Sequence, residues 1–357
     1  MGADLRYLNF MQAKLEVEIA NNHLRRNNEG LLSLFGFTKN GAPAVINENL
    51  DSYGAHLHYF SIERYGQYFY TLPSYTDEAE NDEMVLIKLG FFHDGHELIS
   101  AQPILDNGWV KLTGEISNLL EGDGALIGFN KHEPQCFFYR NLLSASVLNY
   151  FNNQDLFIIS DNLRLISKFQ AMPELNEEAI AQHFIYRHIY GRETYFKGVS
   201  RLQVGELLNW SPTTSSVIIK RDLRALIDAE NQKMVTPQSI DWFFAQFKQI
   251  VGLYLSGCEM NSAIMLSGGI DLSLVHAAIN THIEHGTKFP SYSFVIDSPG
   301  FAYEVEYAVV LVKNIFLNGC VQVIYASLCM ILSVQVLWSQ EISSKKSKIQ
   351  IGSPGAC

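Results

Sequence analysis

The sequence predicts two domains: an α+β domain with mostly antiparallel sheets, followed by an α/β domain with a parallel sheet. Its 357 residues are enough for two domains of ordinary size. From Gly122 onward, short apolar segments recur roughly every ten residues, a spacing typical of antiparallel sheets. Residues 263–275 instead read as an apolar strand, a glycine-rich turn and the start of a helix. That order of elements is typical of α/β domains.

Charge and cysteine content narrow the class of protein. The formal net charge is -11, so we expect no nucleic-acid partner, because binding a phosphate backbone requires a basic face. The five cysteines never occur at Cys-x-x-Cys spacing, so neither a zinc site nor a disulfide framework is indicated. The N-terminus is polar and mixed in charge, unlike a signal peptide. These observations predict a cytoplasmic protein.

The first domain is predicted mainly from its strands. An apolar run at 31–37 ends at a glycine and an Asn-Gly turn signal. Four further strands are expected, at 122–129, 136–139, 148–151 and 156–160. Because these strands are short and closely spaced, they favour antiparallel pairing through tight turns.

The stretch from 174 to 232 is expected to connect the two domains. An amphipathic helix is predicted over 177–190. Thr236 and Pro237 then have the pattern of a helix start, with proline in the first turn. This helix carries an apolar stripe, which we expect to be core, made of Ile240, Phe243, Phe244, Phe247, Val251 and Tyr254.

The glycine-rich turn is the strongest candidate for a binding site. Ser267, Gly268 and Gly269 carry no bulky side chain, so backbone N–H groups could approach an anion closely. Asp271 and Ser273 follow in the first turn of the predicted helix. A carboxylate beside a phosphate requires a cation, and Mg²⁺ prefers oxygen ligands of this kind. The structural alternative is an ordinary turn in which Ser267 and Asp271 cap the helix.

The C-terminal part of the chain allows two interpretations. A second strand is expected at 291–296. Residues 314–340 then carry no charge, and three lysines follow soon after, which satisfies a simple rule for a membrane span. Polar residues dilute the run, however, and a buried strand at 321–325 followed by a helix explains it equally simply. We favour the strand, and expect no membrane association.

The turn resembles a known phosphate-binding loop. Ser267, Gly268, Gly269 and Asp271 match the S-G-G-x-D-S loop of the ATP pyrophosphatase superfamily, and the surrounding chain resembles the asparagine synthase family within it. That family includes the β-lactam synthetases and the lasso-peptide cyclases. The match departs at Leu272, where the family has serine. Losing a hydrogen bond to a charged group weakens binding by roughly 1.5–3 kcal/mol.

The resemblance extends to the first domain, which looks like the end of the family's glutaminase domain. Its counterparts here are the strand at 122–125, Arg140-Asn141, the strand at 148–150 and Ser160-Asp161. Glutamine-hydrolysing members begin Met-Cys-Gly and use that cysteine as nucleophile, whereas this chain begins Met-Gly-Ala. The resemblance therefore implies a degenerate glutaminase-like domain at 1–173, an interdomain segment at 174–232, and the N-terminal part of the ATP-binding domain at 233–357. The family's second signature, S-G-x-G-[AS]-D-E, is absent, so we expect a C-terminally truncated chain.

The resemblance also implies a function. Family members adenylate a carboxylate with ATP, release pyrophosphate and form an amide bond. Without the cysteine, the amine here would be ammonia or an internal amine of a small-molecule or peptide substrate. Asp271 would bind Mg²⁺ with the pyrophosphate, and no catalytic residue is indicated. The implied ATP and pyrophosphate contacts are Leu266, Ser267, Gly268, Gly269, Asp271, Ser273 and Val295. The alternative is an inactive fragment or nucleotide-binding scaffold, and a homodimer is left open.

Overall fold

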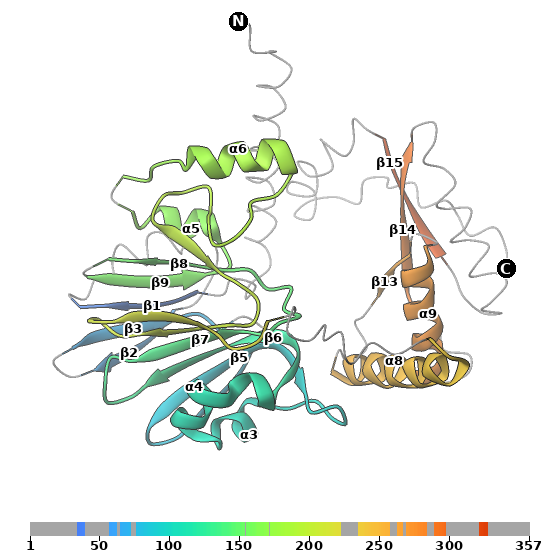
Figure 1. Ribbon diagram of the computed structural model, residues 1–357, viewed down its shortest axis with the longest axis horizontal. Helices are drawn as coiled ribbons and strands as arrows, with labels where there is room; N and C mark the ends of the chain where they lie inside the picture. Colours follow the sequence, from blue (N-terminus) through green and yellow to red (C-terminus); the bar gives the residue numbers. More distant parts are fainter. Residues whose placement is uncertain are drawn as a thin grey trace, which may run out of the picture. The chain divides into compact units, whose positions relative to one another are not determined.

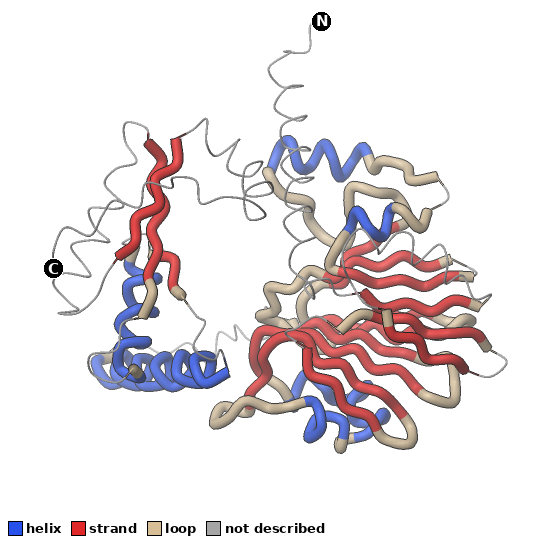
Figure 2. The backbone as a smooth tube through the Cα atoms, turned by 180° about the vertical axis from the view of Figure 1, so that it is seen from behind, coloured by secondary structure: helices blue, strands red, loops and turns tan. Residues whose placement is uncertain are grey.

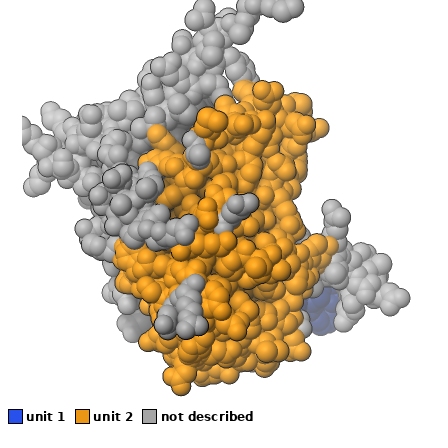
Figure 3. Space-filling model, turned by 90° about the vertical axis from the view of Figure 1, so that its left-hand side faces the viewer, with its two compact units in different colours: residues 1–24, 234–357 blue, residues 25–233 orange. Residues whose placement is uncertain are grey.

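The chain divides into two compact units. One is Arg25–Lys233, and the other is Met234–Cys357 together with Met1–Leu24 (Figure 3). We call them the sandwich unit and the parallel-sheet unit. The computed structural model describes residues 34–39, 57–62, 65–72, 76–153, 155–170, 172–222, 235–257, 263–266, 269–283, 289–297 and 321–327.

The described residues of the sandwich unit form two six-stranded sheets, in which every pairing is antiparallel. The first sheet has the order β10 (Val199–Leu202), β8 (Leu148–Asn152), β9 (Leu156–Ser160), β1 (Leu34–Thr38), β3 (Gly66–Tyr70) and β2 (His58–Ile62). The second has the order β12 (Ser215–Ile219), β11 (Glu206–Trp210), β7 (Cys136–Arg140), β6 (Glu121–Asn130), β5 (Met84–His93) and β4 (Thr76–Glu80). The predicted α+β class with mostly antiparallel sheets is confirmed for this unit.

The two sheets pack face to face over an aromatic core. Alternate residues of each strand point between the sheets, as the two-residue period of a strand requires. Phe35 of β1 lies near the middle of this core, with its ring centroid 5.4 Å from Phe129 and 5.2 Å from Phe138 on the opposite sheet. Trp210 closes one end, 4.8 Å from Phe157. Large buried rings of this kind contribute much of the hydrophobic stabilisation of such a core.

Helices cover the outer faces of both sheets, which gives four layers (Figures 1 and 2). Helices α3 (Ala101–Leu105) and α4 (Gly108–Leu119) lie against the second sheet. Helix α5 (Leu163–Ser167) lies against the first and buries Leu165 and Ile166 there. The strands sandwiched between these layers are buried on both faces, so β1 is apolar along most of its length.

Helix α6 (Glu177–Tyr186) is shorter than the predicted helix over 177–190. Asn176 caps its start, where its side-chain oxygen accepts from the backbone N–H of Ala179. The helix ends at Arg187, which adopts a left-handed conformation with φ of 58°. A left-handed residue at this position terminates a helix, and the amphipathic pattern alone gave no signal for it.

The segment expected to connect the domains contributes strands to both sheets. β10 pairs with β8 in the first sheet, and β11 pairs with β7 in the second. β12 then pairs with β11 as the outermost strand of the second sheet.

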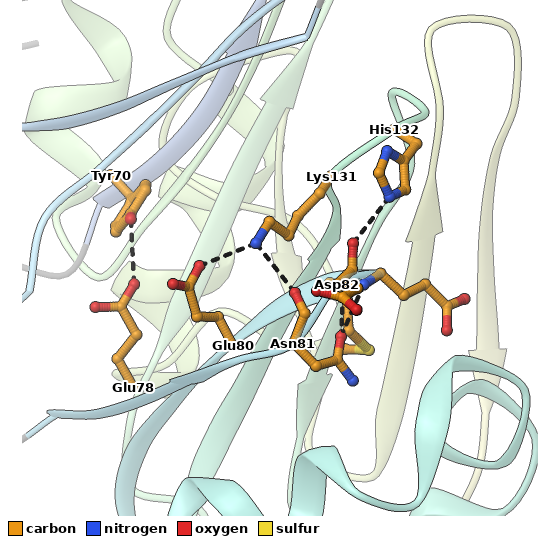
Figure 4. A network of polar contacts seen from close by, with 9 residues as sticks. Tyr70, Glu78, Glu80, Asn81, Asp82, Lys131 and His132 are labelled. Atoms are coloured by element: carbon orange, nitrogen blue, oxygen red, sulfur yellow. Dashed lines mark hydrogen bonds and ion pairs between the residues drawn. The ribbon is translucent and has the colours of Figure 1, made fainter.

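Polar contacts join two neighbouring turns of the second sheet (Figure 4). The Nζ atom of Lys131 lies 3.2 Å from Glu80 Oε2 and donates to the carbonyl of Asn81. The Nε2 atom of His132 lies 2.8 Å from the carbonyl oxygen of Asp82. The acidic turn between β4 and β5 is thus bound to the turn between β6 and β7, and we assign this cluster a structural role.

The parallel-sheet unit contains three strands and two helices among its described residues. The strands β13 (Ile264–Met265), β14 (Ser291–Asp297) and β15 (Val321–Ser327) lie in that order and run parallel. Helices α8 (Pro237–Gly257) and α9 (Ile270–His282) pack against each other. The strands predicted at 263–266, 291–296 and 321–325, and the helix beginning at Pro237, are confirmed.

The predicted burial of helix α8 is wrong. No described residue of α8 is buried, and Ile240 and Phe243 of the predicted stripe expose 44% and 52% of their surfaces. Periodicity predicted the helix correctly, but it carries no information about which neighbour covers the apolar stripe. Helix α8 meets α9 at Lys248, whose carbonyl oxygen lies 2.7 Å from the His282 Nε2.

Candidate functional site

The candidate site lies where β13 ends and α9 begins. β13 pairs with the start of β14, with Ile264 opposite Ser291 and Met265 opposite Tyr292. Leu266 follows β13, is 1% exposed, and donates its backbone N–H to the carbonyl of Tyr292 at 2.7 Å. This bond and the burial of the leucine fix the point at which the chain leaves the sheet.

Helix α9 begins at the predicted glycine-rich turn. Gly269 is its N-cap residue, with φ of −69° and ψ of 159°, and as a glycine it has no side chain to cap the helix. Ser267 and Gly268 lie outside the described residues. The first backbone N–H groups of a helix have no partner within the helix, and the helix dipole adds partial positive charge there.

Asp271 and Leu272 occupy the first turn of α9. Asp271 is exposed, and its carboxylate makes no hydrogen bond or ion pair with the residues that the structure describes. Leu272, at the position of the second serine of the resembled loop, is half-buried and offers no donor.

The hydroxyl of Ser273 is already engaged. Its Oγ donates to the carbonyl of Gly269 at 2.6 Å, and its backbone N–H donates to the same oxygen at 3.1 Å. A phosphate donor role, which the sequence predicts for Ser273, therefore requires the hydroxyl to rotate away from that carbonyl. Sequence analysis did not anticipate this competing bond.

Val295 lies on β14, beyond the level at which β13 ends. It stands three residues past Tyr292, the partner of Met265, and opposite Tyr325 of β15. At 3.3 Å per residue, Val295 is about 10 Å further along the strand direction than the end of β13. In parallel sheets, ligands bind outside the carboxyl ends of the strands, so this part of β14 borders the same side of the sheet as the turn.

A buried histidine, which sequence reasoning did not single out, holds α9 against the sheet. His276 is 3% exposed, and its Nε2 lies 3.1 Å from the Oγ of Ser291. Burial lowers the pKa of His276, because a charged imidazolium loses its hydration. The sequence signal was absent, since a lone histidine on an apolar helix face has no distinguishing pattern.

The arrangement is suited to holding an anion, with one carboxylate placed for a cation. The described residues contain no group of three or more His, Cys, Asp or Glu side chains arranged to hold a metal ion. Asp271 would therefore bind Mg²⁺ only together with oxygen atoms of a ligand. None of the described helices is long and apolar enough to cross a membrane.

The chain was compared with protein families, curated proteins and solved structures, and only solved structures match. No family model matches the chain, and no curated protein matches it. One similar solved structure is that of the allosteric regulatory enzyme of purine biosynthesis, with 8% identity, a TM-score of 0.28 and coverage of 87% of this chain and 76% of that chain. Another is the glutamine phosphoribosylpyrophosphate amidotransferase from B. subtilis complexed with ADP and GMP, with 9% identity, a TM-score of 0.31 and coverage of 88% and 78%. These scores are too low to establish a shared fold.

Proposed function

We propose that the protein is an asparagine synthase-like, ATP-dependent enzyme that adenylates a carboxylate, releases pyrophosphate and forms an amide bond. The observation that carries this proposal is the join of β13 to α9. There the sequence Ser267 to Asp271 resembles a pyrophosphate-binding loop, and the N-terminus of a helix, which begins at Gly269, follows a strand of a parallel sheet.

The residues have separable roles in this proposal. Backbone N–H groups at the start of α9 bind the β- and γ-phosphates, which become pyrophosphate. The Asp271 carboxylate would hold Mg²⁺, which supplies charge neutralisation at the phosphates when bound. Leu266 fixes the strand end by its burial and its bond to Tyr292. The backbone of β14 around Val295 would lie beside the adenine, as the family resemblance implies.

The amine that attacks the acyl-adenylate would be ammonia or an amine of the substrate itself. The substrate would be a small-molecule or peptide carboxylate. Neither the fold nor the loop indicates which carboxylate or which amine reacts. The substrate is therefore to be identified by assay.

Titration calorimetry of the full chain with ATP and Mg²⁺ tests the binding step. We expect saturable binding, weakened at least about tenfold in Asp271→Asn through loss of a charged ligand. Asp241→Asn is the matched control, because Asp241 is also an exposed helical aspartate, on α8. Leu272→Ser restores the serine of the resembled loop and should tighten binding by about tenfold or more. Absence of binding at millimolar ATP, or equal loss in the two aspartate variants, contradicts the proposal.

A nucleotide-binding scaffold without catalysis is the second candidate, and Leu272 favours it by removing a phosphate donor. ATP–pyrophosphate exchange in the presence of candidate carboxylates separates the two. Exchange that depends on a carboxylate supports the enzyme, and ATP binding without exchange across the series supports the scaffold. Ammonium and glutamine, supplied separately, then identify the amine source.

A further inference from the structure

A second polar cluster lies in the sandwich unit, at the edge of the first sheet where β7, β8 and β10 come together. Arg140, the last residue of β7, is 8% exposed. Its Nη1 donates to the carbonyl of Leu202 at 2.9 Å and its Nη2 to the carbonyl of Ser144 at 3.1 Å. The Nε of Arg140 is buried and has no hydrogen-bond partner among the described residues.

Three further groups nearby share this property. Arg201 of β10 stands directly opposite Asn149 of β8 in the antiparallel register. The Nε of Arg201 and the Oδ1 of Asn149 are buried without a partner among the described residues, and so is the Oγ of Ser144. Buried polar atoms are nearly always paired in native proteins. Four buried polar atoms here have no hydrogen-bond partner among the described residues, and two of them belong to the guanidinium groups of Arg140 and Arg201. They therefore indicate a ligand or bound solvent.

The charges of the cluster favour an anion over a neutral ligand. Three arginines, Arg140, Arg192 and Arg201, lie in this region with two carboxylates: the charges of Asp123 and Glu206 act on Arg140, and Arg192 pairs with Glu206, which is 5% exposed. Both oxygens of the Glu206 carboxylate are engaged: Oε1 lies 2.6 Å from Arg192 Nη2, and Oε2 accepts from the backbone N–H of Gln203 at 2.8 Å. Burial lowers the pKa of Arg140, and the charge of Arg201 lowers it further. An additional negative charge would relieve this repulsion.

We propose that the cluster binds a small oxyanion, a carboxylate or a phosphate, between Arg140 and Arg201. Two oxygens of one anion accept from the two Nε–H groups, and the hydroxyl of Ser144 donates as well. The Asn149 amide donates when it is rotated by half a turn, since its oxygen and nitrogen are interchangeable in shape. Solvent reaches the cluster on the side of Arg192, whose side chain is 40% exposed.

The test is thermal unfolding of the full chain with inorganic phosphate or acetate, compared with chloride at the same ionic strength. Saturable stabilisation by phosphate alone identifies a phosphate site, and stabilisation by acetate identifies a carboxylate site. The apparent affinity should fall at least about tenfold in Arg201→Gln, because a charge-assisted donor is lost. Arg164→Gln, which alters an exposed arginine on α5, should retain it. If Arg201→Gln fails to fold, Arg201→Lys, which keeps the charge but lacks the Nε–H group, should show the same loss.

Two outcomes overturn the proposal. Stabilisation no greater than with chloride means that water alone satisfies the orphaned groups. An equal response in the Arg201 and Arg164 variants places the anion elsewhere. Phosphate bound at the α9 turn of the other unit is recognised separately, because Asp271→Asn alters that response and Arg201→Gln leaves it unchanged.

Discussion

The side-chain amide of Asn141 donates to the carbonyl of Gly122 at 2.9 Å and so joins the turn after β7 to the start of β6. The Oδ1 of the same amide accepts from the Tyr139 hydroxyl at 3.0 Å and from the Leu142 backbone N–H at 2.8 Å. Asn141 is 1% exposed, so these three hydrogen bonds are shielded from water. One side chain thereby fixes the geometry of this turn.

Replacing Asn141 by alanine should destabilise the protein by roughly 2–4 kcal/mol, because three buried groups lose their partner. The matched control is Asn209→Ala, since the Oδ1 of Asn209 is buried without a partner among the described residues. Removing an unsatisfied group should change stability by about 0.5 kcal/mol or less. Urea unfolding measures both, and equal losses would contradict the role assigned to Asn141.

Substitutions at Gly205 and Gly191 allow two costs of a side chain at positive φ to be measured separately. One is backbone strain, and the other is a steric clash with neighbouring atoms. Both are left-handed, with φ of 75° and 71°. A Cβ on Gly191 meets no atom within 4 Å, whereas a Cβ on Gly205 overlaps the carbonyl oxygen of Arg221. Gly191→Ala should therefore cost about 1–2 kcal/mol from backbone strain alone. Gly205→Ala should cost a further 1–3 kcal/mol from the clash. Calorimetric unfolding of the two variants measures this difference, and similar transition temperatures would show that the clash is relieved.

Acidification should destabilise the parallel-sheet unit through His276. Burial lowers its pKa in the folded state, so below the unfolded value of about 6.5 the unfolded chain binds more protons. The contribution of His276 to the stability of the folded state is fully present above the unfolded pKa, and it is lost as the pH falls through the folded pKa. His276→Gln keeps a donor near Ser291 and should flatten the decline between about pH 7.5 and 5. The same substitution at exposed His188 is the control, and identical slopes in the two variants would contradict this assignment.

Cys136 should resist thiol reagents in the native protein. Its side chain is 1% exposed, and burial raises the pKa of its thiol well above the ordinary value, so little reactive thiolate forms. We expect iodoacetamide to modify Cys136 only after unfolding, with the modified position read by peptide mass spectrometry. Rapid modification under native conditions would show that β7 opens locally.

The sequence predicted features that depend on neighbouring residues and missed those that depend on distant ones. The join of β13 to α9 was predictable because an apolar run, a glycine turn and a helical pattern follow one another. The cluster around Arg140 was not, because Arg201 meets Asn149 only through the pairing of β10 with β8. The exposure of the apolar stripe on α8 was missed for the same reason. Periodicity shows that a helix has an apolar face, but it does not show which element covers that face.

The place of β1 in the first sheet affects how the chain is made. β1 pairs on one side with β3 and on the other with β9, whose residues follow it by about 120 positions. At 5–20 residues per second, a ribosome needs on the order of ten seconds to make that stretch. During this interval one edge of an apolar strand has no partner and can pair with other chains. A nascent-chain chaperone should therefore bind residues 34–38 until residue 160 has left the ribosome.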